Sequence, residues 1–463
     1  MSRLFGAPRS LWLACAVLAG GCSHDELFGP GGGVSVTVTT PAGTQSGDVR
    51  IAFTLTDDEE TSSDVAIKYS TDGLIYRSAS RAAGSAGTTG LAVSSGGTSH
   101  TFIWDSARDL DGERVSGVTV RVEADGGANE TTGEFSVHNA RYLVATHDTT
   151  TAKVSLFRLD VQDGDLTRIE TLEPGGQRPW DVLFEDGFFY VANRGTNDVT
   201  VLAFDADAET LAVVAGSPFA TDGTGGKYLA TDGDRLFVSN ITSATITIFD
   251  IDDRTGALSL GASSGVAVAA CRTMVVRSGR LYVASETAGE IRVFDIAGSG
   301  ALTASPFSPV TSGGLASPVA LARVGSRLYA ADFATATLAG FNIQGDGDLA
   351  PIAGSPFTFT GLETLQIAVS GGADRLFLAT SSVATLASVE LDALGVATED
   401  TSSPHAAAGE VHTVAAAGTI AVTGNADDNS LEAFAVSSTG TLTAGGDNPF
   451  DLGDPVGRIA ISD

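Results

Sequence analysis

Apolar and polar residues alternate with a period of two along much of the chain after residue 33. Runs such as Val34–Val38 and Val49–Leu55 place every second side chain on one face, which predicts half-buried β-strands. About seven such runs, separated by turn residues, follow one another between residues 34 and 139. This density predicts an antiparallel β-sandwich, and we expect Trp104 to lie in its core.

From residue 140 onward the alternating pattern repeats itself. A strand that begins at Leu143-Val144-Ala145 recurs every 44 to 48 residues, for example at Tyr190-Val191-Ala192 and Tyr282-Val283-Ala284. Each copy is followed by two more strands, the last after a Gly-x-Leu turn, and is preceded by a more apolar fourth strand. Seven four-stranded copies predict a seven-bladed β-propeller over residues 140–463. An α-solenoid has repeats of similar length but needs a period of 3.6, which these copies lack.

The end of the chain predicts how the ring closes. The first copy has no apolar strand of its own before Tyr142, and the chain ends on an unmatched run of that type, Arg458–Ser462. We expect this run to pair inside the first blade, which would remove two exposed sheet edges. The predicted fold class is therefore all-β, a β-sandwich followed by a seven-bladed β-propeller closed by the C-terminal strand.

Two segments of the repeats resemble those of a known family. Tyr190–Val201 and Asp250–Leu258 are similar to the core repeat of lactonase-family (6-phosphogluconolactonase-like) propellers. A Ser-Pro-Phe element that is frequent in secreted members of that family begins at Ser217, Ser305 and Ser355, with a degenerate copy at Asn448. The resemblance covers residues 140–463 and implies the propeller fold and, as an activity, hydrolysis of anionic sugar lactones or related cyclic acids. The shared motifs are structural, and no catalytic motif of the family carries over residue by residue. Residues 34–139 resemble immunoglobulin-like or fibronectin-like modules of bacterial surface proteins.

The first 22 residues have the pattern of an export signal. Arg3 and Arg9 precede the short apolar run Leu11–Leu18, and Leu18–Cys22 resembles a bacterial lipobox, in which Cys22 would be lipidated. Ala19 stands where the common pattern has leucine, so plain signal-peptide cleavage stays open as an alternative. Residues 23–33 are glycine-rich and predict a flexible tether. We expect lipid anchoring in the cell envelope, at the outer membrane or cell surface, or a secreted or periplasmic protein if the lipobox is not used.

The charge and the few cysteines of the chain limit the kinds of partner and chemistry that we expect. The chain has 26 Lys and Arg against 56 Asp and Glu, a formal charge of −30, which argues against nucleic acid. Of the three cysteines only Cys271 remains in the folded body, where we interpret it as a small buried hydrophobe rather than a reactive thiol. The Asp-rich turns lack the spacing of a calcium loop, and no motif calls for a metal or an organic cofactor. We expect a monomer attached to the membrane only through its N-terminal lipid.

Basic residues recur at one place in the repeats, at or just before the apolar strand that should line the central channel. The chain has only three lysines and six histidines, so this recurrence suggests a site for a small anion such as a carboxylate or phosphate. The alternative is that these are ordinary turn residues, paired with neighbouring carboxylates. The candidate ligand-binding residues are Arg178, Asp181, Lys227, Arg272, Gln366 and Arg458, with His412 at the same position.

Two functions follow from this pattern. In the first, the protein is a surface-anchored binding or scaffold module that recognises a small anionic ligand or a protein partner. In the second, it is an exported lactone hydrolase, in which the basic groups polarise a lactone carbonyl and His412 or Glu363 activates water. Convergence of Lys227, Arg272, His412 and Arg458 on one cavity would favour an anion site.

Overall fold

The computed structural model describes residues 34–463 apart from residues 60, 162–163, 262, 360–363, 371, 381–383, 401, 446–447 and 463 and the side chain of residue 365. The predicted export signal, Cys22, the tether over residues 23–33 and Glu363 therefore lie outside the described residues. Within the described part, no helix is long and apolar enough to cross a membrane. The chain divides into two compact units, of which the first contains residues up to 41, 50–104 and 118–134, and the second residues 42–49, 105–117 and 135–463.

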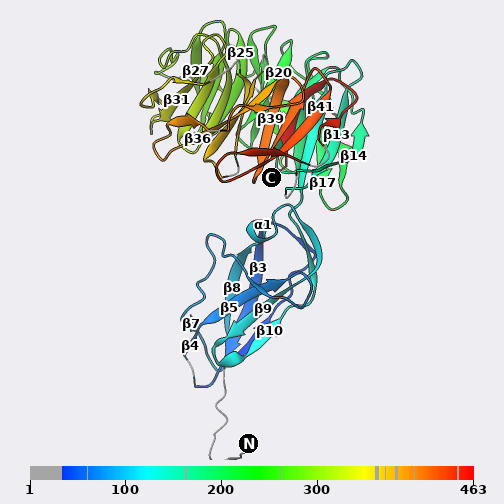
Figure 1. Cartoon of the computed structure of the whole chain (residues 1–463), viewed down its shortest axis with the longest axis vertical. Coiled ribbons are helices and arrows are strands. Elements are labelled where there is room, and N and C mark those ends of the chain that lie inside the picture. Colours follow the sequence, from blue (N-terminus) through cyan, green and yellow to red (C-terminus); the bar gives the residue numbers. More distant parts are fainter. Residues whose placement is uncertain are drawn as a thin grey trace, which may run out of the picture. The chain divides into compact units, whose positions relative to one another are not determined.

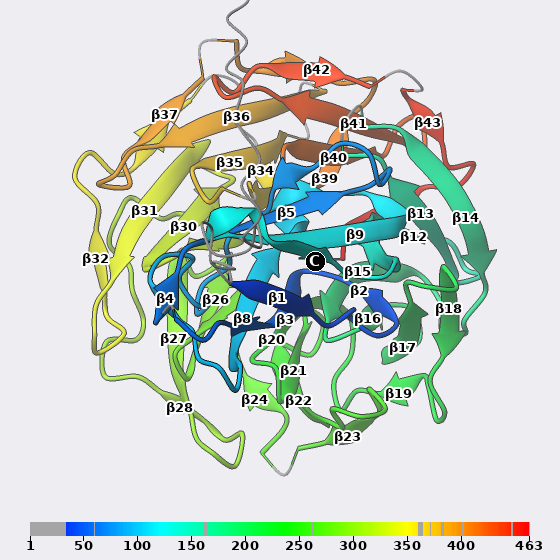
Figure 2. The same cartoon turned by 90° about the horizontal axis from the view of Figure 1, so that it is seen from below.

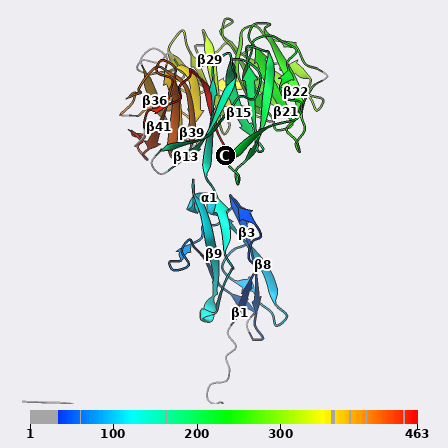
Figure 3. The ribbon, with the colours of Figure 1, turned by 90° about the vertical axis from the view of Figure 1, so that its right-hand side faces the viewer.

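The strands that precede residue 139 form a β-sandwich (Figures 1 and 3). Trp104 is fully buried and stacks on Tyr69 of the facing sheet with 4.9 Å between ring centroids, which confirms its predicted place in the core. The likeness to immunoglobulin modules stays a prediction. One sheet has the strand order β1 (Ser35–Val38), β3 (Asp48–Thr56), β8 (Thr98–Asp105). The other sheet has the order β2 (Thr44–Gln45), β11 (Phe135–His138), β9 (Arg114–Ala124), β5 (Val65–Ser70), β6 (Arg77–Ser78), and β10 (Asn129–Thr131) pairs with β9. Strand β4 (Ser62–Ser63) pairs with β7 (Leu91–Ala92), and two short helical segments are α1 (Ser106–Asp109) and a 3₁₀ turn (Asp125–Gly127).

From β12 onward the described residues form seven antiparallel four-stranded sheets, the blades of the predicted propeller. The described strands of blades 2 to 7, each from the innermost strand outward, are β15 (Pro179–Glu185), β16 (Phe188–Asn193), β17 (Asp198–Asp205), β18 (Thr210–Val213); β20 (Gly226–Thr231), β21 (Arg235–Asn240), β22 (Thr245–Ile251), β23 (Leu258–Leu260); β25 (Cys271–Arg277), β26 (Arg280–Ser285), β27 (Glu290–Ile296), β28 (Leu302–Ala304); β29 (Pro318–Val324), β30 (Arg327–Asp332), β31 (Thr337–Ile343), β32 (Leu349–Pro351); β34 (Thr364–Val369), β35 (Arg375–Thr380), β36 (Thr385–Leu391), β37 (Ala397–Glu399); and β39 (Val411–Ala417), β40 (Ile420–Asn425), β41 (Ser430–Val436), β42 (Leu442–Ala444). In five blades an additional two-residue strand pairs with the third strand: β19 (Phe219–Ala220), β24 (Val266–Ala267), β33 (Phe357–Thr358), β38 (His405–Ala406) and β43 (Phe450–Asp451).

The C-terminal strand closes the ring, as the sequence predicts. Blade 1 consists of β44 (Val456–Ile461), β12 (Arg141–His147), β13 (Lys153–Leu159) and β14 (Leu166–Leu172), in that order from the inside. Strand β44 pairs antiparallel with β12, with Ala145 opposite Ile459. The innermost strands of neighbouring blades contact one another all the way round, from β15 through β20, β25, β29, β34 and β39 to β44 and back to β15. Figure 2 shows the blades following one another around this ring.

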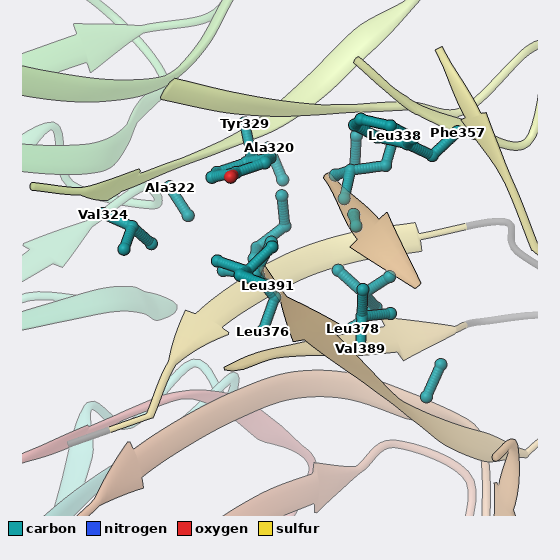
Figure 4. Packing of buried hydrophobic residues seen from close by; sticks show 14 of the residues in the cluster. Ala320, Ala322, Val324, Tyr329, Leu338, Phe357, Leu376, Leu378, Val389 and Leu391 are labelled. Atoms are coloured by element: carbon teal, nitrogen blue, oxygen red, sulfur yellow. The ribbon is translucent and has the colours of Figure 1, made fainter. Parts of the chain in front are cut away.

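Blades pack on one another through apolar faces. Tyr329, Leu338, Leu376 and Val389 come from blades 5 and 6 and belong to one buried cluster (Figure 4). Because both faces of a blade are covered, the middle strands are continuous apolar runs. The buried Tyr329 hydroxyl donates to the carbonyl of Gly395 in the next blade at 2.8 Å, so the phenol is satisfied without leaving the core.

The Ser-Pro-Phe element has a structural role that repeats around the ring. The serine hydroxyl accepts the backbone N–H of the third strand of its blade, as Ser217 does from Val201 at 2.9 Å and Ser355 does from Gly340 at 2.9 Å. The assignment of Ser305 to this element was wrong, because Ser308 makes the equivalent bond in blade 4, to Val293 N at 3.0 Å. Ser264, Ser403 and Asn448 make it in blades 3, 6 and 7.

Candidate functional site

The innermost strand of every described blade carries a β-bulge at the same point. One extra residue stands on this strand relative to the strand beside it, between Pro179 and Asp181 in blade 2 and at the matching position of the other six blades. A bulge leaves one residue unpaired and redirects its side chain, and bulges often lie next to active sites. Residues at these bulges include Trp180, Lys227, Arg272, Val319 and His412.

The redirected side chains line a cavity of about 280 Å³. All five residues just named contribute to its wall, so the repeated bulge explains why residues far apart in sequence meet there. Two loop residues that follow the second strand of their blades, Glu286 and Phe333, complete one part of the wall. Tyr228 and Arg458, each beside a bulge, complete the rest. The cavity thus combines cations with aromatic side chains.

The three cations of the wall differ in how they are compensated. Arg272 is held by Glu286, with Nε to Oε2 at 2.8 Å and Nη2 to Oε2 at 2.5 Å, and it donates from Nη1 to the Tyr228 hydroxyl at 3.3 Å. Lys227 is only 9% exposed and Arg458 only 3% exposed, and neither forms an ion pair within the described residues. The Nε of Arg458 is buried and has no hydrogen-bond partner among these residues.

Aromatic rings take the place of carboxylates around Lys227. Its Nζ lies 4.0 Å from the centroid of the Trp180 ring and 5.3 Å from that of Tyr228. The Cζ of Arg458 lies 5.5 Å from the Tyr228 centroid. Cation–π contacts of this kind offset part of the cost of burying a charge, by about 0.5–2 kcal/mol each. They leave the positive charge itself unneutralised, so the cavity is electropositive.

This arrangement shifts the acid–base properties of its members. Burial lowers the pKa of Lys227; Tyr228 opposes this effect, and the charges of Arg272, Arg458 and Arg194 add to it, so the pKa is lowered overall. Burial opposes ionisation of the Tyr228 phenol, but the positive charges of Lys227, Arg458 and Arg272 outweigh it, so the pKa of Tyr228 is lowered overall. Both groups are therefore closer to proton transfer at neutral pH than the free side chains are.

His412 is the acid–base group of the same wall. Its Nε2 lies 3.6 Å from Oε2 of Glu410. Burial lowers the pKa of His412 and the charge of Arg458 adds to this effect, whereas Glu410 opposes it. The imidazole is consequently neutral at neutral pH and able to accept a proton, with Glu410 available to orient the ring.

The structure brings together four of the sequence-predicted site residues and places three others elsewhere. Lys227, Arg272, His412 and Arg458 line the cavity. Arg178, which was predicted to join them, is exposed and paired with Asp148 at 3.2 Å, as the alternative reading expected. Asp181 and Gln366 are not among the residues that line the cavity: they accept the backbone N–H groups of Leu229 at 2.9 Å and Val414 at 3.2 Å.

These two hydrogen bonds belong to a repeated link between blades. In blades 2, 4, 6 and 7 the residue directly after the bulge accepts a backbone N–H of the innermost strand of the next blade: Thr273 accepts from Leu321 at 2.8 Å, and Thr413 accepts from Ile459 at 3.3 Å. Asp181 lies close to the charges of Arg458 and Lys227, which lower the pKa of its carboxyl group, but burial outweighs both and raises this pKa overall.

Five residues of the cavity wall were not predicted from the sequence: Trp180, Tyr228, Glu286, Val319 and Phe333. Cys271 is fully buried, and burial raises its pKa to about 11, which suits an inert thiol.

Comparisons with known proteins agree with this architecture. The family described as lactonase, 7-bladed β-propeller matches residues 181–276, the segment that carries Lys227, Tyr228 and Arg272. Similar solved structures include a candidate 6-phosphogluconolactonase from Bacteroides fragilis, with a TM-score of 0.60 and 20% identity, covering 70% of this chain and 98% of that one. A second is the periplasmic gluconolactonase of Pseudomonas aeruginosa, with a TM-score of 0.58 and 17% identity, covering 70% and 99%. No curated protein matches the sequence.

The fold is a seven-bladed β-propeller, and its residues 181–276 are similar to the lactonase family of such propellers. At identities of 20% and below, the solved structures establish the fold alone. What the cavity binds is decided by its own residues.

Proposed function

We propose that the propeller binds a small organic anion in the cavity at its innermost strands. The observation that carries this proposal is the pair of buried cations, Lys227 and Arg458, that have no carboxylate partner within the described residues. Burying an unpaired charge costs several kcal/mol, and a fold that retains two of them at a cavity is suited to a ligand that supplies the opposite charge. Each charge-assisted hydrogen bond to such a ligand contributes about 1.5–3 kcal/mol.

The remaining wall limits the size and shape of the ligand. Trp180, Val319 and Phe333 present apolar surface, and the cavity of about 280 Å³ is small for a binding pocket. A carboxylate or phosphate carried on a compact body, such as an aldonate or uronate, fits both the charge and the volume.

The N-terminal sequence supports a location for this binding. Export and lipid attachment through Cys22 would present the propeller in the cell envelope, with the β-sandwich as a spacer. The similar gluconolactonase of Pseudomonas aeruginosa is named as periplasmic, which agrees with an exported propeller. In this arrangement the protein serves as an anchored binding module for a small anion.

Thermal unfolding of the intact chain against gluconate, 6-phosphogluconate, glucuronate and the corresponding lactones tests the proposal. Saturable stabilisation by at least one acid is expected, and it should be lost in Lys227→Met and in Arg458→Met. Arg254→Ala removes one exposed cation outside the cavity and should keep the stabilisation. If every acid leaves the unfolding temperature unchanged, or if the shift persists in both cavity variants, the proposal is wrong.

Lactone hydrolysis is the second candidate, and His412 with Glu410 favours it. Neutral His412 would take a proton from water as the water oxygen attacks the lactone carbonyl carbon. The negative charge that develops on the carbonyl oxygen would face Lys227 and Arg458. The ring C–O bond then breaks, and the departing oxygen takes its proton back from His412.

Following lactone loss in the same samples tests this second step. Hydrolysis that falls at least about 100-fold in His412→Gln, while acid binding is kept, is the expected result for a general base. Binding of acids without any lactone loss would leave a binding protein only.

A further inference from the structure

The three lysines of the chain differ sharply in their partners. Lys68 is paired with Glu123 at 2.6 Å, and Lys153 is paired with Asp454 at 2.9 Å. Lys227 has neither an ion pair nor a hydrogen bond to its amine within the described residues, although it is the most buried of the three. An amine in this state is available for covalent chemistry, because no carboxylate holds its proton in place.

The surroundings of Lys227 favour the neutral amine. Lys227 is only 9% exposed, and the guanidinium groups of Arg272 and Arg458 line the same cavity. Desolvation and like-charge neighbours are the two conditions that turn a lysine into a nucleophile, and the lowered pKa of Lys227 agrees with both.

We propose that Lys227 forms an imine with the carbonyl group of a small 2-oxo carboxylic acid whose carboxylate is held by Arg458. The proposal rests on the proposed function in one respect, that the cavity accepts an organic anion. It goes further by assigning a covalent role to one side chain and a carbonyl compound as the ligand class. Arg458 and Lys227 line the same small cavity. A 2-oxo acid fits this pair because its carboxylate is bonded directly to its electrophilic carbonyl carbon.

The chemistry balances without a cofactor. The lone pair of the neutral Lys227 nitrogen forms a bond to the carbonyl carbon, the C=O π electrons move to the oxygen, and one of the two nitrogen protons is transferred to that oxygen to give a carbinolamine. The C–O bond then breaks, and the hydroxyl group leaves as water with a proton from Tyr228, which lines the same cavity and is bonded to Arg272. The iminium nitrogen gives its remaining proton back to the Tyr228 phenolate, and the net reaction is amine plus carbonyl to imine plus water.

Reductive trapping tests the proposal. The intact chain is incubated with pyruvate and sodium cyanoborohydride, and the adduct is located by peptide mass mapping. Modification of Lys227 at least about tenfold faster than of Lys153 is expected at neutral pH, because the pKa of Lys227 is lowered and that of Lys153 is raised by Asp454. The ratio should rise as the pH falls from about 10.5 towards the folded pKa of Lys227 and stay level below it. Lys227→Met should leave only the slow modification of the other amines.

Two outcomes overturn the imine. One is no adduct at Lys227, and the other is modification of Lys227 and Lys153 at equal rates. Thermal unfolding with the same acids and with pyruvate separates this failure from failure of the binding proposal. Stabilisation by an acid without trapping contradicts the imine alone, whereas the absence of both stabilisation and trapping contradicts both proposals. Competition by gluconate tests the site in the wild-type chain, without the Lys227→Met variant. Gluconate should slow trapping at Lys227 and leave trapping at Lys153 unaffected.

Discussion

Replacing Lys227 by methionine should stabilise the propeller, although it removes a side chain from the proposed site. Methionine has a similar length and keeps the apolar contact with Trp180, while the buried charge disappears. Replacing buried charges by apolar residues of similar volume stabilises proteins by about 1–4 kcal/mol. Loss of the cation–π contact at 4.0 Å costs up to about 2 kcal/mol and reduces this stabilisation. We therefore expect a net increase of about 1–2 kcal/mol in the free energy of unfolding.

The pH dependence of this gain follows from the direction of the pKa shift. In the folded protein the pKa of Lys227 lies below its ordinary value of 10.5. Between the two values the unfolded state binds more protons, so wild-type stability rises with pH through this interval. The advantage of Lys227→Met is thus largest below the folded pKa, shrinks as the pH rises from that pKa towards 10.5, and is lost above about pH 10.5.

Differential scanning calorimetry at a series of pH values measures this advantage. Lys153→Met is the control, because it removes an amine that is paired with Asp454 near the surface, and it should be neutral or slightly destabilising. The reasoning is refuted if Lys227→Met is no more stable than the wild type at pH 7, or if its advantage stays constant up to pH 10.5.

Three further changes test the links that hold the ring. Asp181→Ala leaves the buried N–H of Leu229 without its acceptor and should cost about 1–3 kcal/mol in chemical denaturation, whereas Asp181→Asn keeps an acceptor and should cost less than half as much. Ser355→Ala removes the acceptor of Gly340 N–H and should cost about 1–2 kcal/mol by the same measurement; an unchanged midpoint would show that water replaces the hydroxyl. Deleting residues 456–463 removes the innermost strand of blade 1, and loss of the cooperative unfolding transition is expected, while a sharp transition would show that the ring does not need β44.

The ring and its closure could be predicted because they depend on a pattern that repeats. The alternation of apolar residues marks every strand, and the unmatched run Arg458–Ser462 has a single vacant place, beside Tyr142. The buried tyrosines and the Ser-Pro elements recur for packing reasons that act equally on each blade. Even so, Ser305 was taken for Ser308, since a shift of three residues in a loop leaves the strand pattern unchanged.

The cavity could be predicted only in part, because a bulge changes which face a residue occupies. Lys227 and Asp181 seemed equivalent in the repeat, yet their positions differ by one residue. Lys227 is at the bulge of blade 3, whereas Asp181 comes directly after the bulge of blade 2 and accepts a hydrogen bond from the next blade. An alternating pattern does not record where the extra residue stands. Glu286 and Phe333 come from loops after other strands, and only the three-dimensional ring brings them to the wall.

Calorimetric titration of the intact chain with gluconate, 6-phosphogluconate, glucuronate and pyruvate tests the anion site most directly. We predict saturable one-site binding of at least one of these acids, weakened roughly 10- to 100-fold in Lys227→Met and in Arg458→Met and unchanged in Arg254→Ala, as expected for the loss of one charge-assisted contact. Absence of binding by all four acids at millimolar concentration, or binding that survives unchanged in both cavity variants, would contradict the account.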